Sequence, residues 1–240
     1  MGKAIFLLAA AAVGLAACGA TRAEDGGPVV SRSFPVGAFT KLEVAGPFDV
    51  AVSTGKQPGA AVRGPQKLVE RMVVEVEGDT LTIRPEKSGN IFGGFRWGGD
   101  KARVTVTVPM LEGAAIAGSG NVDVDRVAGD RFMGEVAGSG SLRVPSVAVK
   151  ELQLEIAGSG DVDVAGQAES ARYEIAGSGN IRAGRVASRE TRAEIAGSGN
   201  IEAQASGTAA VDIAGSGNVK VSGGAKCTIS KAGSGNVSCS

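Results

Sequence analysis

The apolar positions between residues 113 and 240 return with a period of 18 to 20 residues, and each return is marked by the tetrapeptide Ala-Gly-Ser-Gly. A fixed period of this length is typical of repeat proteins, in which copies of one structural unit stack. The tetrapeptide occurs seven times, and its first glycines are Gly118, Gly138, Gly158, Gly177, Gly197, Gly215 and Gly233.

Three apolar columns appear when the repeats are aligned on this glycine. Two residues before it stand Ile116, Val136, Ile156, Ile175, Ile195, Ile213 and finally Lys231. Four residues after it stand Val122, Leu142, Val162, Ile181, Ile201, Val219 and Val237. Six residues after it stand Val124, Val144, Val164, Ala183, Ala203, Val221 and Cys239. Because side chains alternate between the faces of a strand, the columns predict two strands in each coil, with these residues inward.

A coil of about 20 residues cannot bury its apolar face alone, whereas coils stacked about 4.8 Å apart pair every strand with its counterpart above and below. The sequence therefore predicts an all-β fold: a parallel β-helix, or solenoid, over residues 113–240. Gly-Ser-Gly forms one corner of each coil. A more variable second corner is expected near Ala128-Gly129, Gly166-Gln167, Ala187-Ser188 and Ser206-Gly207. Short polar residues after the first corner are expected to hydrogen-bond along the axis: Asn121, Ser141, Asp161, Asn180, Asn200, Asn218 and Asn236.

The preceding region, residues 34–112, is predicted to be a β-rich cap. Alternating apolar residues indicate strands at 41–45, 48–53, 73–77, 80–84 and 102–108, and Pro65 precedes one short helix at 66–72. The segment Gly46–Val52 aligns with Gly118–Val124 with two residues deleted, so the cap is expected to begin as a degenerate coil.

The amino-terminal residues have the layout of an export signal, with Lys3 followed by the short apolar run Ala4–Ala17 and then Cys18. Leu15-Ala16-Ala17-Cys18 resembles the lipobox of bacterial lipoproteins. Residues 1–17 are therefore expected to be a cleaved signal, Cys18 to carry the lipid that binds the membrane, and residues 18–33 to be a flexible tether. Gly19 in place of Asp favours the outer membrane, so the expected location is the bacterial cell envelope.

The composition argues against two classes of function, nucleic-acid binding and catalysis. Lysine plus arginine and aspartate plus glutamate are equal at 25 each, and the absence of a basic block argues against a nucleic-acid partner. The chain has no histidine, and the repeated serine has no neighbouring base, so a catalytic site is not expected. A carbohydrate-active β-helix enzyme using Asp49, Asp123 and Asp163 is the alternative, and a structural envelope spacer is the third hypothesis.

Two charged columns follow the repeat. Five residues after the glycine the sign alternates, which favours the stacking register: Asp123, Arg143, Asp163, Arg182, Glu202 and Lys220. Three residues before the glycine all charges are negative: Glu135, Glu155, Glu174, Glu194 and Asp212. We call these five the acidic column. It is a candidate surface for a cation such as Ca²⁺ or for a cationic partner, and the alternative is a solvated face; no other cofactor is expected.

Two further candidate features are a pair of cysteines in the last repeat and an aromatic segment in the cap. Cys227 and Cys239 fall in inward columns of the last repeat and are expected to form a disulfide in an exported protein, the alternative being two buried thiols. The Gly-rich segment with Phe92, Phe95, Arg96 and Trp97 is a candidate contact with a glycan or protein partner, or a cover for the open end of the cap.

The segment Phe39–Val50, followed by repeated Gly-Ser-Gly-Asn or Gly-Ser-Gly-Asp, resembles the GIN-type domain family of autotransporter adhesin heads. The resemblance covers about Phe39–Val221. It implies a β-helical exported domain with an adhesive role and brings no catalytic residues with it. The expected function is that of a non-enzymatic exported lipoprotein whose β-helical surface serves adhesion or another envelope interaction.

Overall fold

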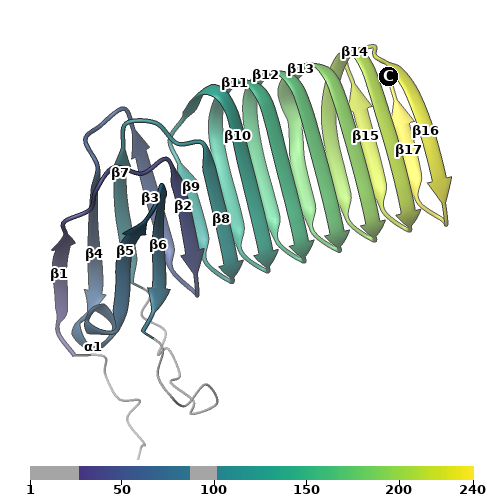
Figure 1. Cartoon of the computed structure of the whole chain (residues 1–240). Helices are drawn as coiled ribbons and strands as arrows, with labels where there is room; N and C mark the ends of the chain where they lie inside the picture. Colours follow the sequence, from purple (N-terminus) through teal and green to yellow (C-terminus); the bar gives the residue numbers. More distant parts are fainter. Residues whose placement is uncertain (1–26, 87–101) are drawn as a thin grey trace, which may run out of the picture.

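The computed structural model describes residues 27–86 and 102–240, in which 17 strands form one continuous sheet beside one short helix (Figure 1). The predicted Cys18 lipidation site and the segment with Phe92, Phe95, Arg96 and Trp97 lie outside the described residues. Within the described residues, no helix is sufficiently long and apolar to cross a membrane.

The carboxy-terminal part is the predicted solenoid. Its strands are β8 (Gly113–Gly118), β9 (Asn121–Val124), β10 (Val127–Gly138), β11 (Ser141–Gly158), β12 (Asp161–Gly177), β13 (Asn180–Gly197), β14 (Asn200–Gly215), β15 (Asn218–Ser222), β16 (Lys226–Ala232) and β17 (Asn236–Cys239). Strands one coil apart pair in parallel, so the rungs follow one another from teal to yellow in Figure 1. From β11 to β14 each strand continues through the second corner, where the register shifts because the coils differ in length.

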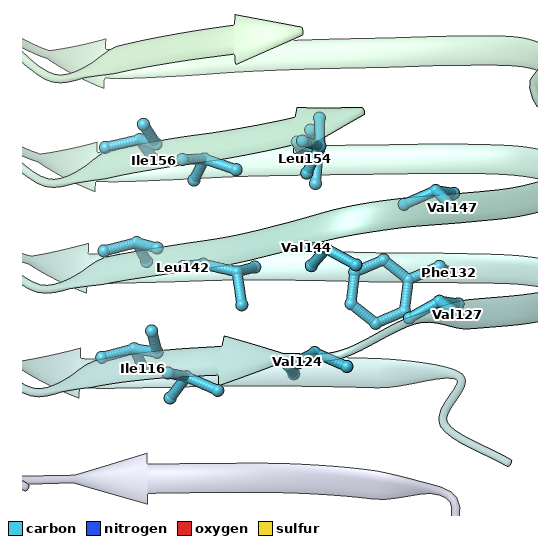
Figure 2. Close-up of a cluster of buried hydrophobic side chains, with 14 of the residues drawn as sticks. Ile116, Val124, Val127, Phe132, Leu142, Val144, Val147, Leu154 and Ile156 are labelled. Carbon is cyan, nitrogen blue, oxygen red and sulfur yellow. The ribbon is translucent and has the colours of Figure 1, made fainter. Parts of the chain in front are cut away.

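The core lies between the two faces of each coil. Every residue of the three predicted columns is buried in the first six coils, whereas in the last coil Lys231 and Cys239 are exposed and Val237 is half-buried. Figure 2 shows Ile116, Leu142 and Ile156 from successive coils pointing into this shared interior together with Phe132. The columns are therefore confirmed for the part of the stack that has a further coil on each side.

The Gly-Ser-Gly corner requires glycine. The first glycine has a positive φ in all seven repeats, from +120° at Gly118 to +136° at Gly197. A Cβ at Gly197 would clash with the carbonyl oxygen of Gly177 in the coil before. Both constraints apply to the first glycine, which explains why it recurs in every repeat.

The polar ladder after this corner forms in two runs, and among the described residues no side-chain hydrogen bond joins Ser141 to Asp161 or Asn218 to Asn236. The amide nitrogens of Asn180, Asn200 and Asn218 each donate to the side-chain oxygen of the preceding coil at 2.8 Å, beginning with Asp161. Earlier in the stack Asn121 donates to Asp49 at 2.8 Å and accepts from Ser141 at 2.7 Å.

The cap consists of β1 (Val29–Phe34), β2 (Lys41–Ala45), β3 (Asp49–Thr54), β4 (Gly59–Pro65), α1 (Gln66–Glu70), β5 (Met72–Glu77), β6 (Thr80–Pro85) and β7 (Arg103–Val108). Strands β2 and β3 stack in parallel on β8 and β9, so the first coil starts in the cap as predicted. Strand β4 pairs antiparallel with β1 and β7, and β5 pairs antiparallel with β6, so these strands end the parallel stack.

Four details of the cap differ from the prediction. The tether does not reach Ser33, because residues 29–33 belong to β1 and pair with β4. The alignment of the degenerate coil needs no deletion, since Asp49 pairs with Asn121 and Ala45 with Ala117 at a constant offset. Strand β4 was not predicted, and the helix ends at Glu70, where the backbone turns into β5.

Candidate functional site

The acidic column stands in register on adjacent strands of one face. Glu135 pairs with Glu155, Glu155 with Glu174, Glu174 with Glu194, and Glu194 with Asp212. Like charges on directly neighbouring strands repel, so the column needs compensation or strong solvation.

Two arginines compensate the carboxy-terminal part of the column. Arg172 lies 3.3 Å from Glu174 in its own coil and 2.9 Å from Glu194 in the next coil. Arg192 pairs in the same way with Glu194 and, at 3.3 Å, with Asp212. Each guanidinium therefore contacts two carboxylates in successive coils. Together the two arginines pair with Glu174, Glu194 and Asp212.

The amino-terminal part of the column has no such arginine. Met133 and Gln153 occupy the strand positions that correspond to Arg172, and Met133 is 48% exposed. Burial raises the pKa of the Glu155 carboxyl, and Glu174 and Glu135 raise it further, whereas Arg172 opposes the shift. In the described part of the chain, neither Glu135 nor Glu155 makes an ion pair. This end of the acidic column is the part that an external cation could still neutralise.

The geometry of the acidic column does not favour a metal site. In the two described stretches, no three histidine, cysteine, aspartate or glutamate side chains lie close enough together to hold a metal ion. The column places its carboxylates in a row along the stack, whereas Ca²⁺ requires six to eight oxygens around one point. A cationic partner that runs along the row fits this arrangement better than a single ion.

A groove lies along the second corner of the coils, where the strand register is irregular. One hollow of about 740 Å³ is lined by alanines and by polar side chains that include Lys150, Gln167 and Arg189. A second hollow of about 440 Å³ has a floor of Ala171, Thr191 and Ala209 and includes Arg172 and Arg192 in its walls.

The two hollows share Ser170 and Glu190, so they meet across the corner, and we call them together the corner groove. The arginines that compensate the acidic column are thus also part of the wall of the corner groove. Sequence reasoning did not identify this groove. The only signal was the variable length of the second corner, which does not say where the surface is hollow.

The column of alternating sign has the predicted register, with Arg143 between Asp123 and Asp163, and Glu202 between Arg182 and Lys220. Its close ion pairs differ from those expected. Arg182 contacts Asp161 at 3.3 Å, and Arg185 contacts Asp163 at 2.9 Å.

The carboxylates considered for an enzyme do not converge as a group. Asp49 and Asp123 border one hollow of about 460 Å³, but Asp163 lies two coils from Asp123, beyond Arg143. Asp49 accepts a hydrogen bond from Asn121, and Asp163 is paired with Arg185. The Asp49 carboxylate therefore belongs to the polar ladder, and the Asp163 carboxylate belongs to a surface ion pair.

The predicted disulfide is present. Cys227 of β16 and Cys239 of β17 are bonded, with their Cα atoms 6.7 Å apart. The bond joins the two strands of the last described coil. Within the described residues no further coil stacks on this one, and the bond ties its two strands together.

Comparison with known proteins places the chain in a family. The family model described as "Putative auto-transporter adhesin, head GIN domain" matches residues 38–225. A solved structure of a putative adhesin from Bacteroides fragilis is 26% identical, with a TM-score of 0.80, and the match covers 89% of this chain and 97% of that one.

A structure from Parabacteroides distasonis, named a putative lipid binding protein, is 25% identical with a TM-score of 0.70, again over 89% and 97% of the two chains. A putative adhesin from the same species shares the fold at 20% identity, with a TM-score of 0.74 and coverage of 90% and 98%. No curated protein matches the chain.

Proposed function

Because the chain belongs to the family of the auto-transporter adhesin head GIN domain, we propose that it is an exported, lipid-anchored adhesion protein whose corner groove binds a glycan or protein of the cell envelope. The observation that carries this proposal is the pair of adjoining hollows at the second corner, which together extend over several coils and present both charge signs and hydroxyl groups.

The shape of the corner groove supports an extended partner. Its two hollows meet at Ser170 and Glu190, and its polar side chains recur once per coil, so a ligand with repeating polar groups can contact several coils at once. Repeated weak contacts along a chain-like ligand add up to useful avidity. A small substrate held by converging catalytic groups has less support, because the carboxylates of the enzyme hypothesis are spread along the stack.

The anchor in this proposal is a lipid on Cys18. Ten residues separate Cys18 from Val29, where β1 begins. At an extended length of about 3.5 Å per residue they span at most about 35 Å, which keeps the cap near the membrane and lets the solenoid extend beyond it.

Two measurements test the proposal. Labelled palmitate should be incorporated into the chain expressed in a Gram-negative host and not into the Cys18→Ser variant. The purified chain should bind a subset of an array of glycans, envelope proteins and lipid vesicles, and Glu190→Lys should weaken that binding.

The matched control is Glu43→Lys, which makes the same charge change at an exposed position of β2, far along the chain from the groove. Equal binding by the chain with Glu190→Lys and the unchanged chain would place the contact elsewhere. Binding to no member of the array would remove the support for adhesion.

A further inference from the structure

At the first corner, a backbone hydrogen bond joins each coil to the next. The carbonyl oxygen of the second glycine accepts the N–H of the ladder residue one coil later. This hydrogen bond is 3.1 Å from Ser141 to Gly120, 3.1 Å from Asn200 to Gly179 and 3.2 Å from Asn236 to Gly217. The next acceptor in this series is the carbonyl oxygen of Gly235.

In the last described coil this carbonyl oxygen accepts a hydrogen bond from the side chain of Lys231. Its ammonium donates to the Gly235 carbonyl oxygen at 2.9 Å. Lys231 stands in the column that holds isoleucine or valine in the six preceding coils, where Ile213 is 3% exposed and Val136 is fully buried. Lys231 therefore has two effects. It puts a charged side chain where the preceding coils have an apolar one, and it binds the Gly235 carbonyl oxygen, which would otherwise accept a hydrogen bond from a following coil.

The rest of this coil keeps the features of an open sheet edge. Strand β16 pairs with β14, and β17 pairs with β15, but within the described residues neither strand has a partner on its other side. Ile229 is 48% exposed and Val237 is half-buried. An edge with unpaired backbone groups and apolar side chains is a template for another chain, and a lysine on it is a common protection.

We propose that Lys231 is a stop residue that prevents the last coil from pairing with the last coil of a second copy of this chain. Two copies meeting there would bring two ammonium groups into an interface that excludes water, at a large desolvation cost. The opposite end of the solenoid carries the antiparallel cap strands β4 and β5, so the coil next to them is not available for the same pairing. Without the lysine, two carboxy-terminal ends can meet coil to coil, and such a twofold contact closes at a dimer.

The test compares the full chain with Lys231→Ile, which restores the residue type of the preceding coils. Sedimentation velocity in mild detergent, with the detergent contribution subtracted, gives the mass of each variant over a range of concentrations. We expect the unchanged chain to remain monomeric. The apparent protein mass of Lys231→Ile should double, with self-association at least about tenfold tighter than that of the unchanged chain.

Two controls distinguish the effect of the charge at Lys231 from non-specific association caused by an added apolar side chain. Lys231→Arg keeps the cation and should remain monomeric. Lys220→Ile adds the same apolar side chain at an exposed position of β15 on the outer face and should also remain monomeric. Amide hydrogen exchange should show concentration-dependent protection of β16 and β17 in Lys231→Ile and nowhere else.

Several results would overturn the proposal. These are a monomeric Lys231→Ile with an intact disulfide and unchanged circular dichroism, assemblies larger than dimers, dimers without protection of β16, and equal self-association of the unchanged chain. Lys231→Met is the second variant should the isoleucine variant fail to fold, and the same outcomes apply to it.

Discussion

The guanidinium of Arg172 lies 2.9 Å from the carboxylate of Glu194, one coil further along the solenoid. The same guanidinium also contacts Glu174 at 3.3 Å. The arginine therefore bridges two carboxylates that the strand register places side by side. Where Met133 and Gln153 stand instead, the acidic column lacks this bridge, so one face of the solenoid contains a compensated and an uncompensated half.

Replacing Arg172 tests the compensated half. Arg172→Met should lower the free energy of unfolding by about 1 kcal/mol, because Glu174 and Glu194 then repel each other without the shared cation. The loss should shrink with added salt, which screens exposed charges. Thermal melting at low and high salt measures both effects. Arg189→Met is the control, since in the described part of the structure this exposed arginine makes no ion pair; an equal loss in both variants would contradict the bridge.

Replacing Glu155 tests the uncompensated half. The pKa of Glu155 is raised above its ordinary value of 4.5 on folding, so its ionised form destabilises the folded chain. The stability that the protonated form supplies is complete below pH 4.5 and is lost as pH rises through the raised pKa. Glu155→Gln should therefore stabilise the chain at pH 7 by less than about 1 kcal/mol. The difference should vanish below pH 4.5, and destabilisation by Glu155→Gln at neutral pH would show that neither burial of the charge nor repulsion by Glu174 and Glu135 dominates at this position.

A corner glycine should be far less tolerant than other glycines of the solenoid. Gly197→Ala places a Cβ against the Gly177 carbonyl at a φ of +136° and should cost at least about 2 kcal/mol in unfolding free energy. Gly184→Ala is the control, because its φ is not in the positive region and its Cβ would meet nothing closer than 3.6 Å. Similar denaturant midpoints for the two variants would mean that the corner can relax.

Tyr173 is fully buried, and within the described residues its hydroxyl has no hydrogen-bond partner. Burial also raises the pKa of this hydroxyl, so it stays neutral. Tyr173→Phe removes the unsatisfied group while keeping the ring, and it should raise the free energy of unfolding by about 1 kcal/mol. A lower melting temperature for Tyr173→Phe would indicate that the hydroxyl is bound, for example by an internal water.

The solenoid could be predicted from the sequence because one physical requirement repeats in every coil. Gly197 must adopt a positive φ beside a neighbouring backbone, and Ile195 must face inward two residues before it. These requirements fix the corner, the inward columns and the stacking register at once. The disulfide followed from the same alignment, since it placed Cys227 and Cys239 in the last coil.

The parts that were missed depend on contacts rather than on period. Strand β4, which reads Gly-Ala-Ala-Val-Arg-Gly-Pro, has small residues at most positions and so shows little apolar alternation, and its place is set by pairing with β1 and β7. The corner groove escaped prediction because it arises where coils of unequal length lose register. The sequence does place Arg172 and Arg192 two residues upstream of Glu174 and Glu194 on the same face, where they could offset the charge. That each arginine also reaches the next coil was not visible in the columns, which show spacing along the chain and not the reach of a side chain.

Adhesion through the corner groove is the central claim, and adhesion itself is its most direct test. Beads coated with the purified chain are mixed with intact bacterial cells and with isolated envelope polymers, and the bound beads are counted. The unchanged chain and Glu43→Lys should adhere equally, while Glu190→Lys, where the two hollows meet, should lose binding by about tenfold, as expected for a central contact. Equal adhesion of all three proteins, or none by the unchanged chain, would contradict the claim.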